Sequence, residues 1–324
     1  MRRPAARAML AGLAGLGLLL TACSPTAGSS RGTAGDGVVD VVASTSVYGD
    51  IVSSIGGDKV RVSSIINRTS QDPHSYEATT QDKLAVSKAE LVVENGGGYD
   101  AFIDTLAADT GLDRSSVINA VDVSGLATES PAAASTAAAS PDSSGHAHEH
   151  AGLNEHVWYS LPAMSRLADA VADKLGILEP GSAETFRSNA AAFKASLGGL
   201  EAKLAAIKAS AGHAPVAVTE PVPLYLLEDA GLENETPAEY TAAIEEDVDV
   251  PPAVLKAAVD LVASRGVRLL AYNTQTEGPQ TLALKKAAQT AGVPVVNFSE
   301  TLPDGQSYLQ WMTGNVESVG KALG

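Results

Sequence analysis

Cysteine is almost absent from this chain, because Cys23 is the only one among 324 residues. A single cysteine excludes an intrachain disulfide and any metal site built from several thiolates. Aromatic residues are also few, at 4% of the chain. The hydrophobic residues nevertheless reach 45%, which is enough for one large core or two medium ones in one to two domains.

Basic residues are outnumbered, with 22 lysines and arginines against 38 aspartates and glutamates and a net charge of −16. This balance argues against nucleic acid, or an anionic membrane surface, as the main partner. The sequence also contains no HExxH motif and no Walker A pattern. These absences argue against the common zinc metalloproteases and P-loop enzymes.

The N-terminus has the pattern of an export signal. Three arginines precede the run "AMLAGLAGLGLLLTAC", which is too short for a confident membrane span. Its last four residues, "LTAC", resemble the lipobox of bacterial lipoproteins, which implies cleavage before Cys23 and lipidation of its sulfur. We therefore expect a signal peptide over 1–22, a flexible tether over 23–37, and a protein lipid-anchored outside the cytoplasmic membrane.

Strands alternate with helices in two parts of the chain, which predicts an α/β fold with parallel sheets. A helical pattern over 182–211 separates the two parts. We expect an N-terminal lobe over 38–181, a linking helix over 182–211 and a C-terminal lobe over 212–324. Residues 127–150 are rich in serine, alanine and proline and end in histidines, which predicts a mobile loop. The predicted strands are 38–46, 60–66, 90–96, 116–121, 214–220, 267–274 and 293–299.

Polar residues that could bind a ligand follow several of these strands. His74 lies in "SQDPHSYEAT", at the predicted opening of a helix, and His156 lies in "NEHVWYS". Glu220 ends one strand of the second half and Glu300 follows another, each close to a proline that would stop the strand. In open α/β sheets, ligands bind at the carboxyl ends of the strands, so these side chains are candidates for one site.

Five stretches in order carry a family resemblance: "ASTSVYGDIVSSIGGDKVRV", "QDPHSYEATTQD", "NEHVWYSLPAM", "VTEPVPLYLLEDAGL" and "FSETLPDGQSYLQWM". From about Val38 onward the chain resembles the zinc/manganese family of ABC-transporter substrate-binding lipoproteins. The resemblance implies two β/α lobes joined by a long rigid helix. It also implies a metal ion in the cleft, held by His74, His156, Glu220 and Glu300. In many relatives, histidine and aspartate stand where this chain has the two glutamates.

This ligand set is chemically consistent with a divalent cation. Two neutral imidazoles and two carboxylates neutralise the ion and leave no large buried charge. Four monodentate ligands would make a tetrahedral zinc site, whereas two bidentate glutamates would give the six donors that manganese prefers. The alternating His146, His148 and His150 could catch an ion weakly and pass it inward, as accessory groups. They favour Zn²⁺, with Mn²⁺ as the alternative.

The remaining polar candidates have simpler interpretations. His213 is expected to be solvated between a helix and a strand. Tyr48, Tyr76 and Trp158 are expected to pack around the cleft. The acidic run from Glu245 to Asp249 is expected to be a solvated face, with a docking edge for the permease as the alternative.

Three functions compete: a receptor that hands a metal ion to an ABC permease and its ATPase subunit, a metal-dependent hydrolase, and a surface adhesin. A catalytic zinc needs an open coordination position, which four protein ligands would not leave. We therefore expect a monomeric receptor and not an enzyme. The rigid helix predicts a small rocking of the lobes, and acid should weaken binding by protonating His74 and His156.

Overall fold

The computed structural model of the protein describes residues 37–71, 73–126 and 153–324. The predicted signal peptide and tether, including Cys23, lie outside these ranges, as do His146, His148 and His150. Within the described ranges, no helix combines the length and the apolar character that crossing a membrane requires.

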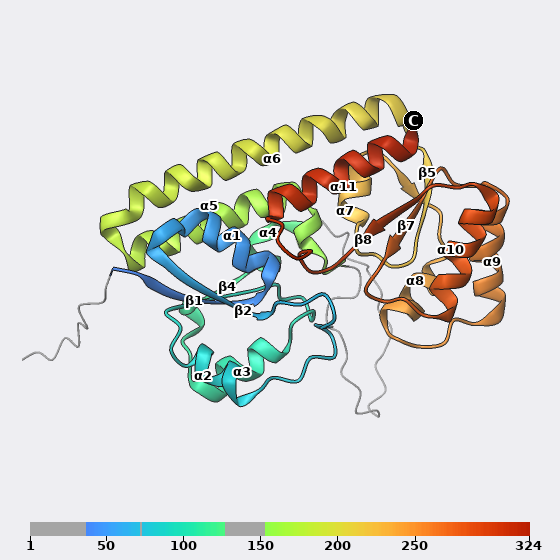
Figure 1. Ribbon diagram of the computed structural model, residues 1–324. Coiled ribbons are helices and arrows are strands. Elements are labelled where there is room, and N and C mark those ends of the chain that lie inside the picture. Colours follow the sequence, from blue (N-terminus) through green and yellow to red (C-terminus); the bar gives the residue numbers. More distant parts are fainter. Residues whose placement is uncertain (1–36, 72, 127–152) are drawn as a thin grey trace, which may run out of the picture. The chain divides into compact units, whose positions relative to one another are not determined.

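The first lobe contains a four-stranded parallel sheet in the order β2-β1-β3-β4 (Figure 1). Alternate residues of its strands face opposite sides. Val41 and Ala43 join a core with α1 and α5, whereas Val42 joins a second core with α2 and α3. Both faces of the sheet are therefore covered, as is usual for parallel sheets. The elements are β1 (Val39–Thr45), α1 (Ser46–Gly56), β2 (Val60–Ile66), α2 (Thr80–Val86), β3 (Leu91–Glu94), α3 (Phe102–Thr110), β4 (Val117–Asn119), α4 (Ala120–Ser124) and α5 (Leu161–Leu178).

The second lobe repeats this design with a parallel sheet in the order β6-β5-β7-β8. Val216 and Val218 face the core shared with α6, α7 and α11, whereas Ala217 faces a separate core with α8, α9 and α10. The predicted α/β class, with two parallel-sheet lobes, is confirmed. The elements are β5 (Pro215–Val218), α7 (Leu224–Asp229), β6 (Glu233–Asn234), α8 (Ala238–Glu245), α9 (Pro252–Ala263), β7 (Leu270–Asn273), α10 (Pro279–Ala291), β8 (Val295–Phe298) and α11 (Tyr308–Leu323).

A single helix of 29 residues, α6 (Ala183–Ala211), links the lobes. It contacts α1 and α5 of the first lobe and α7 and α11 of the second (Figure 1). Its buried stripe recurs at helical spacing, as the sequence predicts. The stripe consists of Phe186, Ala190, Phe193, Leu197, Leu200 and Leu204.

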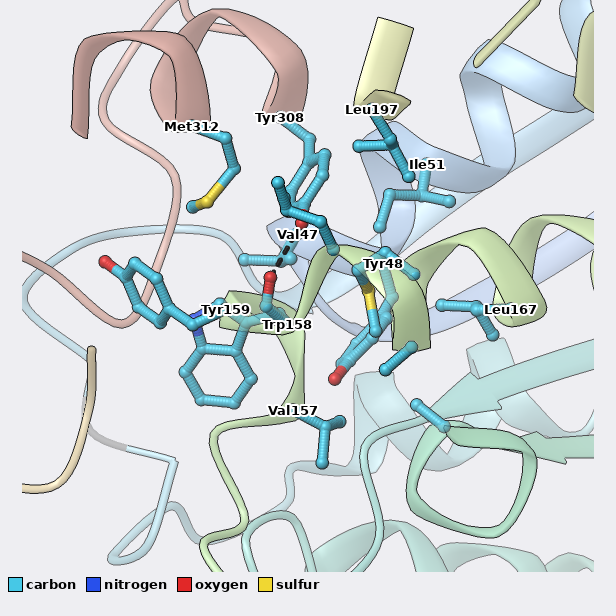
Figure 2. Close-up of a cluster of buried hydrophobic side chains, with 14 of the residues drawn as sticks. Val47, Tyr48, Ile51, Val157, Trp158, Tyr159, Leu167, Leu197, Tyr308 and Met312 are labelled. Atoms are coloured by element: carbon cyan, nitrogen blue, oxygen red, sulfur yellow. Dashed lines mark hydrogen bonds between the residues drawn. The ribbon is translucent and has the colours of Figure 1, made fainter. Parts of the chain in front are cut away.

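One hydrophobic core runs through both lobes beneath this helix. In Figure 2, Ile51 of α1 and Leu197 of α6 lie beside Tyr308 of α11, and all three belong to this core. Because the same core contains side chains from both lobes, the lobes are packed against each other as well as being joined by α6.

The helix predicted to open in the stretch around His74 is present as α2, and His74 itself lies in a turn before it. The next helix, α2, begins at Thr80, and a capping box fixes this start: the Thr79 side chain accepts from the backbone of Asp82, and the Asp82 side chain accepts from the backbone of Thr79. His74 is therefore carried on a loop, six positions before the helix.

Gly198 and Gly199 allow a direct test of the stability of α6. Both are exposed in the helix interior, and a Cβ at either position would meet no atom within 4 Å. Glycine in a helix costs about 0.5–1 kcal/mol relative to alanine. The variant with alanine at both positions should therefore have a free energy of unfolding about 1–2 kcal/mol above that of the native chain. Urea unfolding measures this difference. Gly56→Ala is the contrasting control. Its Cβ would collide with the branched Val60 side chain, whose Cβ would lie 2.9 Å away, so it should destabilise.

Glu94, the last residue of β3, is a buried ionisable group in the first lobe. It is 2% exposed and accepts a hydrogen bond of 2.9 Å from Asn119. It lines a cavity of about 510 Å³ that contains none of the predicted metal ligands. Burial, with smaller effects from Asp100 and Asp104, raises the pKa of Glu94 from its ordinary 4.5 to about 7. The folded chain thus holds a proton at Glu94 where the unfolded chain has lost it.

This shift predicts a pH dependence of stability. Between pH 4.5 and about 7, the folded state binds more protons than the unfolded state, so stability from this group falls as pH rises through that window, by up to about 3 kcal/mol. Glu94→Gln should remove that decline and should exceed the native chain in stability at pH 8. Urea unfolding from pH 4.5 to 8 measures it, with the exposed Glu77→Gln as control. Parallel profiles for the native chain and Glu94→Gln would contradict the assignment.

Candidate metal centre

Two glutamates meet at the carboxyl edge of the second sheet. Glu220 is the second residue after β5, and Glu300 is the second residue after β8. Between these strands lies β7, whose last residue is Asn273. Its side-chain amide donates to Glu220 Oε2 at 2.6 Å and to Glu300 Oε1 at 2.8 Å. Both glutamates are buried. The structure therefore brings the two predicted carboxylates together on one amide group.

The two predicted histidines form a pair in the first lobe. Their ring centroids lie 6.4 Å apart, with His156 buried and His74 more exposed. The Nδ1 of His156 lies 2.7 Å from Asn154 Oδ1. Because Asn154 Oδ1 is an acceptor, this contact favours a proton on Nδ1 and leaves Nε2 unprotonated and able to bind a metal ion. Burial, with His74 nearby, lowers the pKa of His156 well below its ordinary value, which keeps the imidazole neutral.

Tyr99 joins the histidines to the glutamates. Its ring centroid lies 5.0 Å from that of His74 and 5.8 Å from that of His156. Its hydroxyl donates to Glu300 Oε2 at 3.2 Å. Side chains from the first lobe thus reach the carboxylate edge of the second lobe. All four predicted residues gather around Tyr99 and Asn273.

Glu155 is a further candidate that the sequence analysis did not single out. Its Oε1 lies 3.3 Å from His74 Nε2. Ligand atoms of His74, Glu155 and His156 lie within 4.8 Å of one another, a grouping that could hold a metal ion. Burial raises the pKa of Glu155 to about 8, and the nearby carboxylates of Glu245 and Glu300 act in the same direction. Its position directly before His156 in "NEH" was the available signal.

The expectation for the acidic run is wrong at its first residue. Glu245 ends α8 half-buried, with its Oε1 3.9 Å from His156 Nδ1, so it lies beside the histidine pair and is not a fully solvated residue. Burial, followed by the charge of Glu300, raises the pKa of Glu245 to about 7. The rest of the run, 246–249, is exposed as expected. The physical reason is that α8 ends against the site before the chain turns outward.

The other expectations have mixed outcomes. His213 is exposed and pairs with Glu233, as predicted for a solvated residue. Trp158 packs near the site, with its ring centroid 5.1 Å from that of His156. Tyr48 is buried and donates to Asn95. Tyr76 instead packs on Phe102 in the core between the first sheet and α2 and α3.

The chain matches known proteins along most of its length. A family model described as zinc-uptake complex component A, periplasmic, matches residues 41–322. The metal ABC transporter substrate-binding lipoprotein ScbA of Streptococcus cristatus is 24% identical over 320 residues, which cover 94% of each chain.

Two solved structures share the fold. FpvC from Pseudomonas aeruginosa, in complex with Mn²⁺, has a TM-score of 0.69 at 23% identity and covers 88% of this chain and 98% of its own. The periplasmic zinc binding protein TroA from Treponema pallidum has a TM-score of 0.68 at 20% identity and covers 89% and 99%.

These comparisons confirm two predictions, the fold and the family. The structures share the fold of two lobes and a long helix. The matching family is described as periplasmic, which agrees with the predicted location outside the cytoplasm, and the relatives are named lipoproteins. Because the family model spans nearly all the described residues, the chain belongs to the zinc/manganese-type family of ABC-transporter substrate-binding lipoproteins.

Proposed function

We propose that the chain is a receptor that captures one divalent transition metal ion between its lobes and delivers it to the permease of an ABC importer. The observation that carries this proposal is the gathering of two imidazoles and two carboxylates, from opposite lobes, around Tyr99 and Asn273. The family's receptor role supports it. The chain acts as a monomer whose partners are the permease and its ATPase subunit.

The proposed ligands are His74, His156, Glu220 and Glu300. Together they carry two negative charges, which match a divalent cation. Glu155, 3.3 Å from His74, supplies a further oxygen close to the same place. The amides of Asn154 and Asn273 orient His156 and the two glutamates, which is how groups around a metal fix its ligands.

Zinc is the proposed cargo, with manganese as the alternative. The paired imidazoles and the histidine-rich loop favour zinc, whereas each added carboxylate oxygen favours manganese. Structural neighbours carry both names, one in complex with Mn²⁺ and one a zinc binding protein. The carboxylates of Glu155 and Glu245 therefore favour manganese more than the four proposed ligands alone would.

A receptor and a hydrolase differ in coordination. Hydrolysis needs a metal position open to water with a general base beside it, whereas a receptor encloses the ion with protein donors. The proposed ligands come from both lobes, which favours enclosure. The adhesin alternative draws no support from the contacts described above.

The binding test uses the chain from Ser24 onward, stripped with a chelator and then exposed to equal zinc and manganese. We expect one tightly bound ion per chain and a higher melting temperature with the preferred metal, because a ligand of the native state stabilises it by mass action. His156→Ala and Glu220→Ala should each weaken binding by more than about 100-fold, as measured by calorimetry.

His213→Ala is the matched control, because His213 is exposed and pairs with Glu233 outside this group of residues. It should bind the metal like the native chain. Tight binding that survives both His156→Ala and Glu220→Ala would place the ion elsewhere and would overturn the proposal.

A further inference from the structure

Two side-chain amides cross from one lobe to the other beside the proposed ligands. The first is that of Asn154. Its Oδ1 lies 2.7 Å from His156 Nδ1 and accepts the backbone N–H of His156 at 3.1 Å. Its Nδ2 donates across to the carbonyl of Pro221 at 2.9 Å, directly after Glu220. Asn154 therefore contacts the proposed ligand His156 in its own lobe and also binds the backbone next to the proposed ligand Glu220 in the other lobe.

The second is the amide of Gln275, which belongs to the second lobe and binds backbone groups of both lobes. Its Oε1 accepts the backbone N–H groups of Glu300 at 2.7 Å and Thr301 at 2.9 Å. Its Nε2 donates to the carbonyl of Thr69 at 3.1 Å, on the loop that leads to His74. The two amides thus form a reciprocal pair, one anchored in each lobe.

The orientation of both amides follows from their partners. A backbone N–H can only donate, so the atom that faces it must be the amide oxygen. The N–H of His156 fixes Oδ1 of Asn154, and the N–H of Glu300 fixes Oε1 of Gln275. The NH₂ end of each amide is then left to face the carbonyl of the opposite lobe, where it donates.

These crossing bonds differ from the contacts along the shared core. There, Tyr308 donates to the carbonyl of Trp158 at 2.7 Å, as Figure 2 shows, and Tyr159 donates to the carbonyl of Ser299 at 2.8 Å. Both of those bonds are buried, so breaking them would cost their full desolvation. The Gln275 bond is exposed and the Asn154 bond is partly so. Water can replace them when the lobes separate.

We propose that Asn154 and Gln275 are a latch that holds the lobes closed over the ion and sets its release rate. They are positioning residues, which touch the ligand-bearing segments and not the ion. A second cross-lobe bond supports Asn154, because Tyr225 of α7 donates to its backbone carbonyl at 2.7 Å. The latch rests on the proposed function, since a release rate exists only if the site binds metal.

Isosteric variants separate the latch from ligand positioning. Asn154→Asp and Gln275→Glu keep the oxygen that accepts from His156 or Glu300, but they place a second oxygen against the opposite carbonyl. Loss of one hydrogen bond should raise the metal dissociation rate about fivefold, and the double variant should release faster still. The added negative charge alone would slow release of a cation, so the two effects have opposite signs.

Stopped-flow chelation from the zinc-loaded chain measures release. Asn189→Asp is the matched control, because the Asn189 amide donates to the carbonyl of Ile55, which belongs to a contact between α6 and α1. It should release zinc at the native rate. Native release rates in Asn154→Asp and Gln275→Glu, together with an unchanged distance between the lobes in the metal-free double variant, would overturn the latch.

Spin labels provide a readout that needs no metal. The chain from Ser24 has no cysteine, so labels at Leu84→Cys in α2 and Leu282→Cys in α10, both exposed, would report one distance between the lobes. In the metal-free double variant this distance should be longer or more broadly distributed than in the metal-free native chain. An unchanged distribution overturns the latch, even if the native chain binds no metal and the proposed function fails.

Discussion

The site depends on one amide group. Asn273, at the end of the central strand β7, donates both of its side-chain hydrogens, one to Glu220 and one to Glu300. Glu220 and Glu300 follow β5 and β8, the strands on either side of β7, and two carboxylates at this buried edge would otherwise repel each other. The Asn273 amide bridges them, and Thr276 and Tyr99 each donate one further hydrogen bond, to Glu220 and Glu300 respectively. Without the bridge, each carboxylate would be held separately and not to the other.

The shared core explains how two lobes can hold one ion with little motion. Side chains from α1, α6 and α11 pack in one continuous cluster (Figure 2), so the lobes are fixed along one side. The polar contacts of Asn154 and Gln275 lie beside the ligands, where separation would begin. A fixed apolar side and a breakable polar side favour a small rocking of one lobe against the other, in keeping with the linking helix.

Sequence patterns were sufficient where a local rule determined the position of a residue. Glu220 and Glu300 follow strands, and parallel strands end at one edge, so the amino-acid order alone places both glutamates there. Glu245 could not be placed in this way, because its proximity to His156 depends on where the short α8 ends. Asn273 has no motif, and its role arises only because β7 lies between β5 and β8. The contacts of Glu245 and Asn273 depend on tertiary packing, which a local sequence pattern cannot predict.

The placement of Trp158 has a consequence for how this molecule can be observed. The indole lies edge-on to His156, with ring centroids 5.1 Å apart, and follows it by two positions on a rigid turn. Any change in the charge or orientation of that imidazole alters the electrostatic field at a buried chromophore. Under the proposed function, an ion that binds His156 should therefore change the intrinsic fluorescence of the chain without any added dye.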